Sequence, residues 1–199
     1  MFRKADFGDL KRITEIYDEI HMEEEAGRAC IGWVRSIYPT RKTAEASIKN
    51  GDMFVEIEEG RIVAAGILNQ EQVPEYADAK WDYDVPDDQV MVLHTLVVSP
   101  KVGKNGYGSK FVTYYEQFAL EHNCHYLRMD TNEKNRAART LYKKLGIKRF
   151  PLFHVNLMEL KVYVWSVLKR SYSCTYPFFI LAVVLSFQQL NLLFPLFFH

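Results

Sequence analysis

A glycine-rich loop between a predicted strand and a predicted helix contains the residues of this sequence that are best suited to ligand binding. The loop runs from Ser99 to Gly108, after an apolar strand predicted over 90–98 and before a helix predicted over 106–123. Glycine lets the main chain turn sharply and approach a ligand closely. The first amides of a helix lack partners within it and lie at the positive end of its dipole. The loop therefore predicts a site for phosphate or pyrophosphate.

The loop alone leaves other interpretations open. Its spacing is G-x-x-G-x-G, at Gly103, Gly106 and Gly108, and several predicted strands precede it. A dinucleotide-binding loop instead has G-x-G-x-x-G early in a βαβ unit, and the Walker pattern is also absent. A tight turn that binds no ligand stays an alternative on this evidence.

A second motif, further along the chain, decides between these interpretations. Here the chain resembles the GNAT acyltransferases, whose acyl-CoA motif is Arg/Gln-x-x-Gly-x-Gly/Ala after a strand ending in apolar-Val-x-Pro. The later motif of that family is Asn-x-x-Ala-x-x-Leu-Tyr-x-Lys-x-Gly-aromatic, and the resemblance covers residues 2–148. The matching residues are Pro100, Gly106 and Gly108 in the first motif, and Asn135, Ala138, Leu141, Tyr142, Lys144 and Gly146 in the second. Gly103 departs from the family's Arg or Gln, and the neighbouring Lys104 can supply a cation instead.

The resemblance implies that acetyl-CoA is the acyl donor and assigns roles to individual residues. Main-chain groups of Leu96 and Val98 would pair with the pantetheine arm and polarise the thioester carbonyl. Tyr142 would protonate the departing thiolate, and Asn135 would contact the cofactor, cap its helix, or do both. The predicted cofactor-binding residues are Leu96, Val98, Gly103, Lys104, Asn105, Gly106, Gly108, Ser109 and Asn135.

His94 is the candidate for the base that removes a proton from the acceptor amine. Alternation along the strand would place Val92, His94, Leu96 and Val98 on one face. The carboxylate that family members often use would fall near Val92, so this sequence lacks it. Histidine has an unperturbed pKa suited to the task. The alternative is a partly buried histidine without a catalytic role.

The leading hypothesis is direct transfer of an acetyl group to a primary amine in a ternary complex, without a metal. The amine belongs to a small molecule or to a peptide. Residues 22–38 and 76–84 are expected to flank the acceptor, and their candidates are Glu24, Trp33, Tyr38, Trp81 and Tyr83. The alternative function is a GNAT-fold module that binds CoA without catalysis.

The fold class predicted from the element order is α/β, a mixed central sheet of the GNAT type with helices on both faces. Strands are expected at 2–5, 53–57, 61–68, 90–98 and 125–129. Helices are expected at 6–20, 32–38, 40–50, 106–123 and 135–145.

Composition narrows the classes of partner. Among 199 residues, 48% are hydrophobic and 25% charged, which allows a sizeable core. The formal net charge is zero, which argues against general nucleic-acid binding. Three cysteines without metal-ligand spacing, and an N-terminus without an apolar signal segment, predict a cytoplasmic protein. The oligomeric state is open, and a homodimer is compatible with the sequence.

The sequence changes character near residue 150. We expect a GNAT domain over 1–149 and an aberrant apolar tail over 150–199, whose charged residues are only Glu159, Lys161, Lys169 and Arg170. The preferred explanation is a shifted reading frame, which would leave the closing strands of the sheet missing or altered. A membrane anchor over 176–198 is a weaker alternative, because Gln188, Gln189, Asn191 and Pro195 interrupt the apolar run. An unusual native tail is the third.

Overall fold

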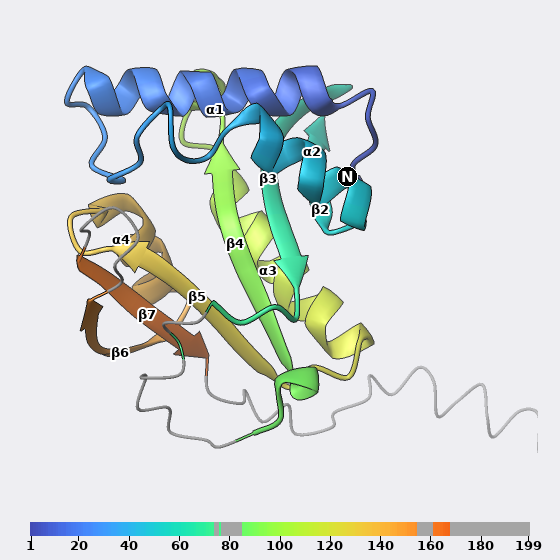
Figure 1. Cartoon of the computed structure of the whole chain (residues 1–199), viewed down its shortest axis with the longest axis vertical. Helices are drawn as coiled ribbons and strands as arrows, with labels where there is room; N and C mark the ends of the chain where they lie inside the picture. The colour runs from blue at the N-terminus through green and yellow to red at the C-terminus, as the bar shows by residue number, and fades with distance from the viewer. Residues whose placement is uncertain (74–75, 77–84, 155–160, 168–199) are drawn as a thin grey trace, which may run out of the picture. The chain divides into compact units, whose positions relative to one another are not determined.

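The computed structural model describes residues 1–73, 76, 85–154 and 161–167 (Figure 1). These residues belong to one compact unit, Met1–Lys169. The remaining unit, Arg170–His199, lies outside the described residues. The membrane-anchor alternative falls there, as does Cys174, and both stay untested. None of the described helices is long and apolar enough to cross a membrane.

The described strands form one mixed sheet of seven strands in the order β1-β2-β3-β4-β5-β7-β6. β4 and β5 run parallel, and every other neighbouring pair is antiparallel. This arrangement confirms the predicted mixed sheet. The strands are β1 (Phe2–Lys4), β2 (Met53–Glu58), β3 (Arg61–Asn69), β4 (Val90–Val98), β5 (Tyr126–Asn132), β6 (Lys148–His154) and β7 (Lys161–Val167).

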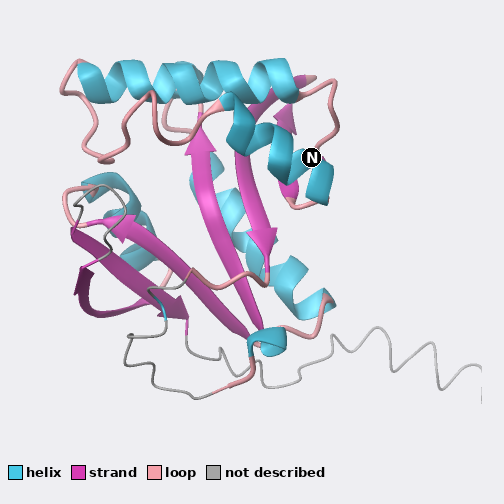
Figure 2. Cartoon of the chain, in the orientation of Figure 1, coloured by secondary structure: helices cyan, strands magenta, loops and turns pink. Residues whose placement is uncertain are grey.

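Helices cover both faces of the sheet, as predicted (Figure 2). They are α1 (Leu10–Glu25), α2 (Arg41–Asn50), α3 (Tyr107–Glu121) and α4 (Arg136–Lys144). On one face, Ile13 of α1 and Ile48 of α2 pack on Val55 and Ile67 of the sheet. On the other face, Phe111 of α3 packs in a second cluster. Burying these apolar side chains holds the helices against the sheet.

The helix predicted over 32–38 is wrong, and the reason lies in the preceding helix. The carboxylate of Glu24 accepts the amides of Ile31 at 2.5 Å and Gly32 at 2.9 Å. Gly32 has φ 85°, in the left-handed region that ends regular right-handed structure. The segment is therefore a loop between α1 and α2. The helix predicted over 40–50 is present as α2, and the Thr40 side chain caps it by accepting from the Thr43 amide.

The closing strands, which were predicted to be missing or altered, are present as β6 and β7. β7 pairs antiparallel with β5, from Leu127↔Val167 to Asn132↔Val162, and β6 pairs with β7. The sequence of β7, Lys-Val-Tyr-Val-Trp-Ser-Val, is rich in β-branched and aromatic residues that favour extended backbone. The domain boundary at 149 and the shifted reading frame stay predictions. Residues 155–160 and 168–199 lie outside the described residues.

Glu56 of β2 gives the fold a pH-dependent stability. Its side chain is 1% exposed, and its Oε2 has no hydrogen-bond partner among the described residues. Burial raises the pKa of Glu56 to about 7, against the weaker opposing effect of Lys110. The native state therefore holds a proton that the unfolded chain releases at lower pH. Stability from this group is complete below the unfolded pKa and falls as the pH rises towards 7.

We expect Glu56→Gln to remove this loss, since a neutral amide has no ionisation cost. The free energy of unfolding of the wild type should fall by up to about 3 kcal/mol between pH 4.5 and 7.5 because of this residue. Urea unfolding at several pH values measures the difference between variant and wild type. Glu45→Gln, at a partly exposed position on α2, is the control. Parallel pH profiles for Glu56→Gln and wild type would contradict the assignment.

Candidate active site

β4 and β5 separate halfway along their length, and this separation organises the candidate site. Their parallel pairing runs only from Val90↔Tyr126 to Leu93↔Met129. Figure 1 shows the two strands diverging beyond that point. From Thr95 to Val98, no described strand pairs with the side of β4 that faces β5. Main-chain groups on that side are available to a ligand that lies along the strand.

The hydrogen bond of Ser99, the residue that follows β4, fixes the direction in which the main-chain groups of Val98 and Leu96 point. The Ser99 amide donates to Val63 O at 2.9 Å and so points towards β3. Main-chain groups alternate sides along a strand, so those of Val98 and Leu96 point the other way, towards the separation. These are the two residues whose main chain was predicted to hold the pantetheine arm.

A β-bulge interrupts β4 at the separation. The register with β3 shifts between Ala65 and Ile67, and Thr95 has φ 51°. Left-handed backbone is unfavourable for a β-branched residue, so surrounding contacts must hold it there. One of these is a hydrogen bond between the hydroxyls of Thr95 and Tyr38, from the loop before α2. Trp33 packs edge-on against Tyr38, with ring centroids 5.8 Å apart.

Because of the bulge, His94 lies on the opposite face of the sheet from Leu96 and Val98. Leu96 and Val98 pack with the cluster of Leu93 and Phe111, whereas Val92 belongs to a separate cluster on the opposite face. An extra residue at the bulge shifts the alternation by one. The prediction that Val92, His94, Leu96 and Val98 share a face is therefore wrong. His94 precedes the bulge and keeps the side of Val92.

The neighbours of His94 fix which of its nitrogens is basic. Its Nε2 lies 3.1 Å from Asn69 Oδ1. The same amide group donates through Nδ2 to Asp52 at 3.3 Å, and Oδ1 accepts the Glu71 amide at 3.1 Å. Because Oδ1 is an acceptor, this contact favours the neutral tautomer in which Nε2 carries the proton and Nδ1 is basic.

Asp130 of β5 lies on the same face of the sheet as His94. Leu93 of β4 and Met129 of β5 are the last pair of the two parallel strands. The next residue on each strand is His94 on β4 and Asp130 on β5, so these two lie at the same level. The Tyr76 hydroxyl donates to Asp130 Oδ2 at 3.1 Å. Burial lowers the pKa of His94, and the carboxylate of Asp130 opposes that effect. The imidazole is therefore neutral at pH 7, as a base must be before it accepts a proton.

The glycine-rich loop has the geometry that anion binding requires. Gly106, with φ 77°, is the N-cap of α3, and no side chain caps the helix there. The first helical bond at this end is from the Lys110 amide to Gly106 O, which leaves the amides of 107–109 without helical partners. A side chain built at Gly106 would meet no atom within 4 Å, so the space beside Gly106 is open. Phosphate fits such a position.

Other loop residues have distinct local roles. Asn105 Nδ2 donates to Val102 O at 2.9 Å and stabilises the turn, while Lys104 is exposed. Gly103 has φ 70°, which favours glycine. A Cβ at Gly108 would lie 3.2 Å from Leu141 Cδ2, so close packing of α3 on α4 accounts for the glycine. Ser109 lies in the first turn of α3.

α4 contributes the remaining predicted residues. Asn135 Oδ1 accepts the Ala138 amide at 3.1 Å, which confirms its role as the helix N-cap. Tyr142 is 5% exposed and packs in the same cluster as Met129 of β5. Burial raises the pKa of Tyr142, and Asp130 raises it further. The phenol therefore keeps its proton at neutral pH and can act as a donor.

Comparison with known proteins identifies the family. The sequence model of the acetyltransferase (GNAT) family matches residues 12–147, more than half of the chain. The chain belongs to the GNAT family. Acetyl-CoA is the acyl donor of this family, and the separated strands and free helix amides described above fit its pantetheine arm and diphosphate.

Solved GNAT structures share the fold at low sequence identity. An acetyltransferase of the GNAT family from Streptococcus agalactiae is 21% identical, with TM-score 0.73, over 85% of this chain and 95% of that one. The yncA protein of Salmonella typhimurium, solved with its cofactor acetyl-CoA, is 16% identical, with TM-score 0.61, over 84% and 92%. A ribosomal-protein-alanine N-acetyltransferase from Brucella melitensis is 15% identical, with TM-score 0.63, over 84% and 99%. None of the curated proteins matches the chain in sequence.

Sequence reasoning missed the polar groups around His94. Asn69, Thr95 and Asp130 come from three different strands, and no motif marks them. Only the pairing of β3, β4 and β5 brings them near one another. Tyr38 was named only as a residue near the acceptor, and its contact with Thr95 gives it a defined position. The other acceptor candidates Trp81 and Tyr83 lie outside the described residues.

Proposed function

We propose that this GNAT protein transfers an acetyl group from acetyl-CoA directly to a primary amine, within a ternary complex. The observation that carries the proposal is the separation of β4 from β5, towards which the main-chain groups of Leu96 and Val98 point. An amide aimed at the thioester oxygen stabilises the negative charge that develops there during attack.

Acetyl-CoA would be held at two places, one for its pantetheine arm and one for its diphosphate. The pantetheine arm pairs with Leu96 and Val98 as an added strand does. The diphosphate binds the amides between Gly103 and Ser109, with Lys104 as the nearby cation and Asn135 at the start of α4. The departing sulfur then lies within reach of Tyr142 on α4.

The transfer step uses one base and one acid. The amine nitrogen bonds to the acetyl carbon, and the carbon–sulfur bond breaks. Nδ1 of His94 accepts the proton that the amine loses, directly or through water, and Tyr142 donates a proton to the thiolate. Both groups are in the required state at neutral pH, because burial lowers the pKa of His94 and raises that of Tyr142.

The acceptor is a primary amine on a small molecule or a peptide. The Brucella melitensis neighbour is a ribosomal-protein-alanine N-acetyltransferase, so an amine of a protein is an acceptor within this fold. In this chain, Trp33 and Tyr38 approach β4 from the loop between α1 and α2. We assign that loop to the acceptor side.

Thiol release from acetyl-CoA over a panel of amines tests the proposal. We expect turnover that depends on both the amine and acetyl-CoA. The second candidate function is CoA binding without catalysis, which Gly103 favours because the family's Arg or Gln is absent there. That module would show thermal stabilisation by CoA and no thiol release with any amine.

The pH dependence of turnover should report His94. We expect kcat/KM to fall as the pH drops through a pKa below 6.5, because protonated His94 accepts no proton. In His94→Gln, kcat should fall by about a hundredfold and this acidic limb should disappear. Initial rates between pH 5 and 9 measure both effects. His122→Gln, at an exposed position on the far end of α3, is the control. An acidic limb that persists in His94→Gln would assign the base elsewhere.

A further inference from the structure

A buried carboxylate on α1 connects that helix to the turn that leads into the phosphate loop. Glu19 is 3% exposed. Its Oε2 accepts the Ser99 hydroxyl at 2.5 Å, and its Oε1 lies 3.1 Å from Lys101 Nζ. Both partners belong to the segment between β4 and Gly103. Glu19 is distant from this segment in sequence and appears in no motif.

A third partner anchors the carboxylate to the sheet. Arg12 Nη1 donates to Glu19 Oε1 at 2.8 Å, and Arg12 Nε donates to Ile62 O of β3 at 3.3 Å. Ser99 is joined to the same strand, since its amide donates to Val63 O at 2.9 Å. α1, β3 and the turn therefore form one connected unit around a single carboxylate.

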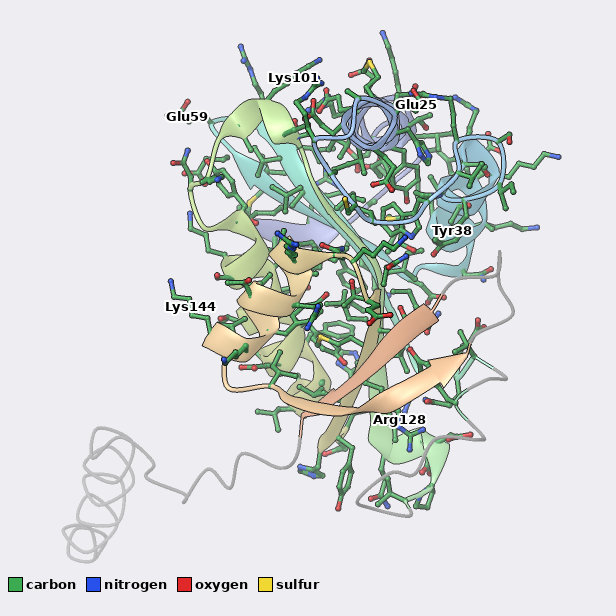
Figure 3. The ribbon with its side chains drawn as sticks, turned by 90° about the vertical axis from the view of Figure 1, so that its left-hand side faces the viewer. Glu25, Tyr38, Glu59, Lys101, Arg128 and Lys144 are labelled. Atoms are coloured by element: carbon green, nitrogen blue, oxygen red, sulfur yellow. The ribbon has the colours of Figure 1, made fainter. Side chains whose placement is uncertain are left out.

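The turn that Glu19 holds is short and leads directly to the predicted diphosphate site. Pro100–Val102 form a single 3-10 turn, and the Ser99 hydroxyl also accepts the Lys101 amide at 3.3 Å. Gly103 follows at φ 70°, and α3 begins at Tyr107. Figure 3 shows Lys101 at this turn, at the same end of the molecule as α1 seen end-on. A shift of the turn would displace the amides that follow it.

The groups around Glu19 keep its carboxylate ionised, and both of its oxygens accept hydrogen bonds or form ion pairs. Burial alone would raise the pKa of Glu19, but hydrogen bonds from Arg12, Ser99 and Lys101 outweigh it and lower the pKa. Hydrogen bonds to an ionised group are the stronger kind, so this contact can hold a loop in one conformation. The ammonium of Lys101 is drawn towards α1 by the same carboxylate.

We propose that Glu19 is a positioning residue for the diphosphate of acetyl-CoA. It fixes the turn 99–102 so that the amides from Gly103 to Ser109 converge on the phosphates, and it engages Lys101, which leaves Lys104 as the phosphate's cation. This role rests on the proposed function, because it presumes that the diphosphate binds at the N-terminus of α3.

S-acetyl-pantetheine separates this role from a general structural one, because it carries the thioester but lacks the diphosphate. We expect Glu19→Ala to raise the KM for acetyl-CoA and the Kd for CoA about tenfold, with kcat within about twofold. Its kcat/KM for S-acetyl-pantetheine should equal that of the wild type. Calorimetry with CoA gives the Kd without reference to turnover, and Tm is recorded for each variant.

Two further variants complete the design. Ser99→Ala removes one bond from the loop side and should raise the Kd for CoA in the same direction but less, which covers the case of an unfolded Glu19→Ala. Glu15→Ala is the matched control, since Glu15 is on the same helix and contacts the same Arg12 at 3.3 Å, but is exposed. It should leave the Kd unchanged.

The outcomes distinguish this inference from the proposed function. Equal losses with acetyl-CoA and S-acetyl-pantetheine, or an unchanged Kd for CoA in Glu19→Ala and Ser99→Ala, would overturn the role of Glu19. Wild-type protein that binds CoA but never releases thiol would refute acetyl transfer alone. In that case the calorimetric comparison still decides the role of Glu19. Wild-type protein that does not bind CoA would overturn both.

Discussion

Replacing Tyr142 with phenylalanine should lower kcat about a hundredfold while leaving the Kd for CoA almost unchanged. The phenol is 5% exposed on α4, and burial raises its pKa so that it stays protonated across the working pH range. Without this proton donor, the sulfur must leave as an alkyl thiolate, which is a poorer leaving group than the neutral thiol. Steady-state rates at saturating acetyl-CoA give kcat, and calorimetry gives the Kd for CoA. Together they show whether the substitution affects the chemical step or binding.

A thioester with a more acidic thiol makes this test sharper. An aryl thioester of acetate expels a thiolate that needs no proton, so Tyr142→Phe should approach the wild-type rate with it. Tyr114→Phe is the matched control, because Tyr114 lies on α3 and stacks on Phe2, 4.5 Å between ring centroids. A loss in Tyr142→Phe that is equally large with both thioesters would show that the phenol acts by packing and not by proton donation.

The second large effect is expected at Gly106. Alanine in left-handed backbone costs about 1 kcal/mol, and at the N-cap of α3 we expect the chain to relieve this cost by rotating the amides that follow. We expect Gly106→Ala to raise the Kd for CoA at least about tenfold, because the converging amides lose their common direction. Calorimetry with CoA measures the effect.

Gly60 provides a control with nearly the same backbone. It has φ 74° against 77° at Gly106, and a Cβ at either position meets no atom within 4 Å. Gly60→Ala in the β2–β3 turn should therefore lose similar stability without losing affinity for CoA. If the two variants bind CoA equally well, the amides at the start of α3 are not the diphosphate site.

The sequence predicted the parts of the fold that depend on local pattern. The helices predicted over 40–50 and 135–145 are present, since the cap at Thr40 and the left-handed glycine at Gly146 are local features. The helix over 32–38 failed because the carboxylate of Glu24, outside the segment, takes two of its amides. The closing strands were predicted to be missing or altered because the composition changes near residue 150, yet valine and aromatic residues still form β7.

The candidate site was predictable only where motif residues lie close in sequence. The loop 103–109 follows from its glycine spacing and Tyr142 from the resemblance to the family motif, but their assigned roles stay predictions. The environment of His94 depends on a bulge that shifts the side-chain alternation of β4, and a period-two pattern cannot show that shift. Glu19 and Ser99 contact each other across a long sequence separation, so only the folded chain reveals the pair.

The backbone of Thr95 shows where this fold accepts a local cost. Glycine would adopt φ 51° with less strain, yet the chain has a β-branched residue there whose hydroxyl meets that of Tyr38. A sequence selected only for stability would be expected to have glycine at residue 95, where the backbone is left-handed. Glycine at residue 95 would relieve the backbone strain but would also remove the hydrogen bond to Tyr38, and so would release the loop between α1 and α2 from β4.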